Sequence, residues 1–189
     1  MNFRLPGLFA CALALSLAAC ASTPSKPLRP GIDELNSLVA DSTQQLLQDI
    51  REENAAADIW LAYAGVDNMS AADLGSAKAD TDQVVTEILV NSKEFRMISE
   101  RQVQAARRAA GIARVEELTL QAPRDKFLAQ LTEQGRVPDY LMFGNFTSVD
   151  ADRDDGRERR YRLTLQMMDS KSGEIAAQRS GVFTQQENR

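Results

Sequence analysis

The sequence contains no histidine, and this absence removes the commonest general base and the commonest metal ligand of proteins. Only two cysteines occur among the 189 residues, so thiolate ligands for a zinc site are also too few. Basic residues (22) are outnumbered by acidic ones (27), and the net charge of −5 argues against a nucleic-acid partner. After the first twenty residues, no apolar run is long enough to span a membrane. Composition alone therefore argues against zinc enzymes, nucleic-acid-binding proteins and integral membrane proteins.

The first nineteen residues have the pattern of an export signal. Arg4 and the amino terminus supply positive charge, and residues 8–17 form an apolar stretch too short to cross a bilayer. The segment ends in Leu17-Ala18-Ala19-Cys20, which resembles the lipobox of bacterial lipoproteins. This resemblance implies cleavage before Cys20, lipidation of its sulfur and an N-terminal membrane anchor. Alanine at position 21 resembles the sorting signal for the outer membrane, facing the periplasm. An ordinary secretory signal is the alternative interpretation.

After the predicted signal, residues 1–19, the chain divides into three parts. Residues 20–30 are the lipidated Cys20 and a flexible tether with three prolines, whose reach is about 35 Å at ~3.3 Å per residue. Residues 31–57 are predicted to form an amphipathic helix and a connection, because apolar residues recur there at helical spacing. Residues 58–189 are predicted to form the globular domain. Cys11 lies within the signal, so no disulfide is expected in the mature chain.

The pattern of strands predicts the fold class. Residues 58–66 carry apolar side chains on both faces, which is typical of a central strand, and residues 94–98 and 140–147 predict two more. Residues 160–168 alternate, with apolar side chains on one face and polar ones on the other, and a turn at residues 170–173 leads to a last strand at residues 175–184. We expect an α+β fold: a mixed, mainly antiparallel sheet of about five strands with packed helices.

Capping patterns predict where the helices begin. Residues 67–80 are interpreted as a loop, and Asp80 with Gln83 resembles a capping box that opens a helix. Ser99 with Gln102 predicts the start of the next helix. Pro123 suits the first turn of a further helix.

No constellation of residues supports catalysis. The acidic residues 150–156 resemble a calcium loop, but glycine comes one position late and Tyr161 replaces the glutamate at the twelfth position. We therefore interpret them as a solvated hairpin tip. Serine has no histidine to activate it, and the glycines form no phosphate-binding cluster. The sequence predicts that the protein is not an enzyme and uses no cofactor and no metal.

Two exposed features are candidates for partner binding. Arg101, Arg107 and Arg108 lie on or beside one helix of an otherwise acidic chain, where a solvated helix face is the alternative. Asn68 and Met69 follow the first strand, and a methionine in such a loop can instead be a satellite of the core.

Several segments together resemble the LpoB family. The matching segments are residues 60–68 (WLAYAGVDN), 95–99 (FRMIS), 139–144 (DYLMFG), 161–169 (YRLTLQMMD) and 172–175 (SGEI). The resemblance implies a fold similar to the N-terminal domain of TolB. It also implies an outer-membrane lipoprotein, expected to be a monomer, that binds an accessory domain of a bifunctional class A penicillin-binding protein and activates peptidoglycan synthesis. Because the same fold serves other roles, an assembly lipoprotein of an envelope secretion or efflux complex remains the alternative.

Overall fold

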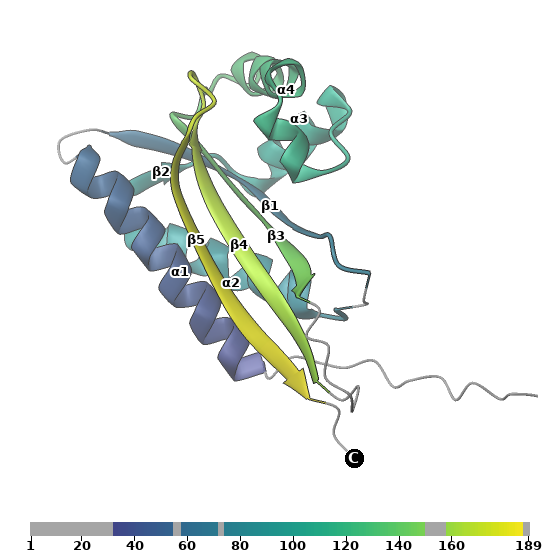
Figure 1. Ribbon diagram of the computed structural model, residues 1–189. Coiled ribbons are helices and arrows are strands. Elements are labelled where there is room, and N and C mark those ends of the chain that lie inside the picture. The colour runs from purple at the N-terminus through teal and green to yellow at the C-terminus, as the bar shows by residue number, and fades with distance from the viewer. Residues whose placement is uncertain (1–31, 55–57, 72–73, 150–157, 187–189) are drawn as a thin grey trace, which may run out of the picture.

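The computed structural model describes residues 32–54, 58–71, 74–149 and 158–186 (Figure 1). The predicted signal, the tether and the acidic residues 150–156 lie outside these ranges. Along the described chain the elements follow in this order: α1 (Ile32–Glu53), β1 (Ile59–Asn68), α2 (Ala77–Ser92), β2 (Phe95–Met97), α3 (Glu100–Ala110), the 3-10 helix η1 (Val115–Thr119), α4 (Gln121–Glu133), β3 (Tyr140–Val149), β4 (Glu158–Asp169) and β5 (Ile175–Gln186).

The five strands form one mixed sheet in the order β2-β1-β3-β4-β5, which confirms the predicted α+β class. β1 lies inside the sheet and pairs in parallel with both β2 and β3, whereas β3, β4 and β5 form sequential antiparallel hairpins. β1 runs two residues further than predicted because its pairing with β3 continues until Asn68 lies opposite Phe146. The antiparallel ladders are longer than the parallel ones.

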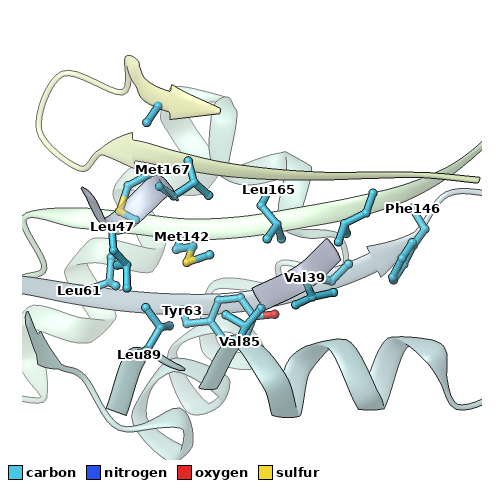
Figure 2. Close-up of a cluster of buried hydrophobic side chains, with 14 of the residues drawn as sticks. Val39, Leu47, Leu61, Tyr63, Val85, Leu89, Met142, Phe146, Leu165 and Met167 are labelled. Carbon is cyan, nitrogen blue, oxygen red and sulfur yellow. The ribbon is translucent and has the colours of Figure 1, made fainter. Parts of the chain in front are cut away.

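Helices α1 and α2 cover one face of the sheet and form the larger core with it (Figure 1). In Figure 2, Val39 and Leu47 of α1 and Val85 and Leu89 of α2 lie against side chains of the strands. The apolar side of β4 faces this core, where Tyr161 stacks on Phe183 of β5 with ring centroids 5.5 Å apart. Helix α1 is therefore a structural layer of the domain.

Contacts with β5 hold α1 close to the sheet. Gly181 lies beneath Leu38, and a Cβ atom at position 181 would come within 2.0 Å of that side chain. Arg179 of β5 forms an ion pair with Asp49 of α1, with 2.5 Å between nitrogen and oxygen. The missing side chain at residue 181 thus allows the helix to approach the edge strand closely.

The opposite face of the sheet is covered over only part of its area. Helices α3 and α4, with η1, pack a second core against β1 and β3 through Val103, Leu118 and Phe127. In Figure 1 these helices gather at the end of the sheet near the β4–β5 turn, and the remaining length of β4 and β5 has no helix on this side. One face of the β3–β5 region is therefore open.

The two predicted capping boxes had different outcomes. Ser99 does cap α3, since its side-chain oxygen accepts a hydrogen bond from the Gln102 amide at 3.4 Å. The prediction for Asp80 was wrong, because α2 begins at Ala77 and Asp80 already lies in its first turn. Ala77 is buried against the core, so packing extends the helix by a turn into the segment interpreted as loop.

Candidate interaction site

A polar cleft opens where β1 loses its outer neighbour. β2 pairs only with residues 59–61 of β1, and the Ile98 amide donates the last hydrogen bond, to the Leu61 carbonyl. A β-bulge follows between Tyr63 and Gly65, and Gly65 has φ of +102°, a left-handed conformation that favours glycine. The cleft, of about 460 Å³, lies over this bulge and is lined by residues of α2 and α3.

Two charged side chains satisfy the backbone of the bulge. Asp82 of α2 accepts hydrogen bonds from the Tyr63 hydroxyl (2.7 Å), the Val66 amide (3.0 Å) and the Lys78 ammonium (2.8 Å). Arg107 of α3 donates from Nη1 to the Ala64 carbonyl at 2.8 Å. These bonds take the place of the missing strand, because buried backbone groups require a partner. At the cleft, the free edge of β1 is therefore bonded to side chains in place of a strand: Asp82 from α2 and Arg107 from α3.

Burial, reinforced by the charges of Asp82, Glu100 and Asp67, raises the pKa of the Tyr63 hydroxyl well above its ordinary value of 10.0. Above pH 10 the unfolded chain therefore loses this proton while the folded chain keeps it, and the free energy of unfolding falls as pH rises. We expect Tyr63→Phe to remove this contribution, at most about 1.4 kcal/mol per pH unit, after an initial loss of ~1 kcal/mol from the missing hydrogen bond. Urea unfolding of both proteins between pH 9 and 11.5 measures it, and equal slopes would contradict the assignment.

A second, smaller cleft lies at the end of β1 and contains two predicted residues. Asn68 accepts hydrogen bonds from the Ser70 amide (2.9 Å) and hydroxyl (2.6 Å), so the chain turns there and leaves Met69 42% exposed. Asp67 accepts from the Val115 amide at 2.7 Å and ties this end of β1 to η1. Together with Arg114 these residues line a cleft of about 390 Å³.

The structure separates the three predicted arginines. Arg107 is half-buried and lines the first cleft, and its Nη2 also donates to the carbonyl of Ala113, a residue of the second cleft, at 3.3 Å. Arg101 and Arg108 are exposed on α3 and line neither cleft. Asn68, Met69 and Arg107 are thus brought to neighbouring clefts, while the other two arginines lie apart. Binding by any of the five stays a prediction.

Sequence reasoning missed Asp82, Tyr63 and Lys78. Asp82 is one of many carboxylates on helix faces, and nothing in its local pattern indicates that it bonds to a strand. Gly65 was the available signal, because a glycine within an apolar strand often marks a bulge.

The charged side chains of the first cleft are used within the protein, because Asp82 and Arg107 bond to the bulge of β1. Within the described ranges, no group of three carboxylate or cysteine residues could hold a metal ion. In the same ranges, no helix is long and apolar enough to cross a membrane.

Comparison with known proteins identifies the family. The model of the family described as peptidoglycan-synthase activator LpoB matches residues 34–180, which include most of α1 and extend into β5. The C-terminal domain of LpoB from Salmonella enterica has a similar structure, with a TM-score of 0.55 and 18% identity over 79% of this chain and 97% of that one. The NMR structure of E. coli LpoB matches with a TM-score of 0.52 and 16% identity over 98% of this chain and 84% of that one.

At these identities the solved structures support the fold alone, and no curated protein sequence matches the chain. The family model, in contrast, matches well over half of the sequence, so its description can be applied to the chain. The chain therefore belongs to the LpoB family of peptidoglycan-synthase activators.

Proposed function

We propose that the protein is an outer-membrane lipoprotein that binds a bifunctional class A penicillin-binding protein and activates it. The family match over residues 34–180 carries this proposal, because it spans both faces of the sheet and all of the described helices except the first residues of α1. Activation of synthesis is the family's role, and the class of synthase and the outer-membrane location are our proposal.

Activation requires only that the protein bind one state of the synthase more tightly than another. If docking on an accessory domain favours the active state tenfold, it shifts the equilibrium by about 1.4 kcal/mol without any chemistry from the activator. Both polymerisation of glycan chains and cross-linking of peptides would rise together if one active state serves both sites.

The anchor is proposed from the lipobox-like segment, which lies outside the described residues. We expect Cys20→Ala to leave the protein uncut or soluble, because the thiol that accepts the lipid is absent. Fractionation of membranes and a label for acyl chains measure the result, with Cys11→Ala as the matched control that keeps Cys20. Recovery of acylated Cys20→Ala protein in the outer membrane would contradict the lipoprotein assignment.

Binding is tested with immobilised residues 21–189, which retain every described helix and strand. The expected result is retention of one class A penicillin-binding protein from the same organism, by a protein that sediments as a monomer. Failure to retain any of these synthases, together with oligomers that grow with concentration, would contradict the proposal and favour an assembly role.

A further inference from the structure

The uncovered side of β3, β4 and β5 is a flat surface whose side chains are fixed by the pleat. Tyr161, Leu163 and Leu165 of β4 point into the core beneath α1, so the residues between them point the other way. We define the open sheet face by the residues on this side of three strands: 145, 147 and 149 of β3, 160, 162, 164 and 166 of β4, and 178, 180, 182 and 184 of β5. The register places these residues side by side, for example Thr147 opposite Arg162, and Arg162 opposite Val182.

The charge of the open sheet face is opposite to that of the chain. Its only charged residues are Arg160 and Arg162, and no Asp or Glu occupies any of its positions, although the chain carries 27 acidic residues. Asp67 of β1 lies next to its border, opposite Asn145, and is bonded to the Val115 amide. These strand positions therefore carry positive charge in an acidic protein, although residues 150–159, which lead from β3 into β4, contain five acidic residues and three arginines.

No carboxylate neutralises these two arginines within the described ranges, and the same holds for Arg101 and Arg108 of α3. Four other cations do form ion pairs: Arg51 with Glu94, Lys78 with Asp82, Arg96 with Asp58, and Arg179 with Asp49. Arg160 and Arg162 are both exposed and make no described ion pair. Their guanidinium groups remain available for carboxylates of another molecule.

The remainder of the face is uncharged and held in place. The Thr164 and Ser180 hydroxyls are hydrogen-bonded at 3.0 Å, and the Gln166 and Gln178 amides at 2.6 Å. Val182 lies beside Arg162 and is 40% exposed. A rigid polar surface with one exposed apolar residue loses little entropy when a flat partner docks.

We infer that the open sheet face, centred on Arg160 and Arg162, docks an acidic surface of the synthase. This inference rests on the proposed function and specifies the docking face and the charge of the partner surface. It also differs from the sequence prediction, which placed the basic contact on α3. The arginines would attract the acidic partner surface and fix its orientation, while Val182 and the hydroxyls of Thr164 and Ser180 make direct contact with it.

The test compares charge reversals on the two basic surfaces. The variant Arg160→Glu/Arg162→Glu is expected to bind the class A synthase at least tenfold more weakly at low ionic strength, chiefly through a slower association rate. Ser180→Glu, which adds one negative charge to the same face, is expected to weaken binding in the same direction. Arg101→Glu/Arg108→Glu on α3 is the matched control, because it makes the same charge change at exposed sites and should bind within twofold of wild type.

Binding kinetics against the immobilised synthase, with thermal unfolding of each variant, separate the outcomes. If wild type binds and the sheet-face variants bind equally well, the docking face is wrong while the proposed function stands. Loss of binding by the α3 variant alone would also overturn the inferred docking face. If wild type binds no class A synthase, the proposed function fails, and the docking face fails with it. A folded sheet-face variant with weak binding that no longer depends on salt supports the inference.

Discussion

A chain that lacks α1, residues 55–189, is expected to show no cooperative unfolding transition. Five apolar side chains of α1 are buried against the sheet and α2, and burying each contributes about 1.5–3 kcal/mol: Leu35, Val39, Leu46, Leu47 and Ile50. Their sum is comparable to the whole net stability of a domain, about 5–15 kcal/mol. The deletion would also uncover Tyr161 and Phe183 in the sheet. Circular dichroism with increasing temperature and urea measures the transition.

The control for this deletion is the chain of residues 21–189, which should unfold cooperatively. A sharp transition in residues 55–189, within a few degrees of the control, would show that α1 is dispensable. If the domain cannot fold without α1, this helix cannot lengthen the connection between the domain and the proposed lipid anchor. Unravelling α1 would extend the reach from about 35 Å to roughly 110 Å at ~3.3 Å per residue, but only by unfolding the domain. If α1 cannot unravel, the predicted tether of residues 20–30 would set how far the domain can reach from the proposed anchor.

Substitution of Gly144 by valine is expected to destabilise the domain by about 3 kcal/mol, at the upper end of the range for overpacked cores. Gly144 lies in β3 between Val66 of β1 and Leu165 of β4. A Cβ atom there would lie 2.6 Å from both the Leu165 side chain and the Thr164 carbonyl oxygen. The carbonyl belongs to the neighbouring strand and cannot move without breaking the ladder. Urea denaturation of both proteins gives the difference in the free energy of unfolding.

Ser148→Val is the matched control, because it adds a similar side chain at an exposed position of the same strand. It should change the free energy of unfolding by less than about 0.5 kcal/mol. A Gly144→Val protein as stable as this control would show that the centre of the sheet is less tightly packed than the structure indicates.

Local patterns were sufficient where a local cause determines the structure. The alternation in β4 predicted both the strand and its buried side, and Ser99 with Gln102 predicted the start of α3. Local patterns did not predict the start of α2, because Ala77 is buried by packing against distant segments. An acidic residue such as Asp80 is as favourable in the first turn of a helix as at its N-cap, so it does not mark the first residue. The parallel pairing of β1 with both β2 and β3 is likewise a property of the whole sheet, which strand patterns do not specify.

The candidate site was predicted less well, because contacts between distant segments determine it. Arg107 was grouped with Arg101 and Arg108 by sequence proximity, yet its guanidinium is used by the Ala64 carbonyl at the bulge. Its partner in that role, Asp82, comes from a helix on the other side of the sheet. The alternation of residues 160–168 correctly predicted a polar side of the strand, and this side includes Arg160 and Arg162. That this side has no covering helix could be known only from the arrangement of α3 and α4 (Figure 1).

The most direct test of the proposed activation is glycan-chain synthesis from lipid II by the class A penicillin-binding proteins of the same organism, with and without residues 21–189. The account predicts faster synthesis by one of these synthases, with the others unchanged, and a smaller gain with Arg160→Glu/Arg162→Glu than with Arg101→Glu/Arg108→Glu. Unchanged rates with every synthase, at concentrations that saturate any binding, would contradict it.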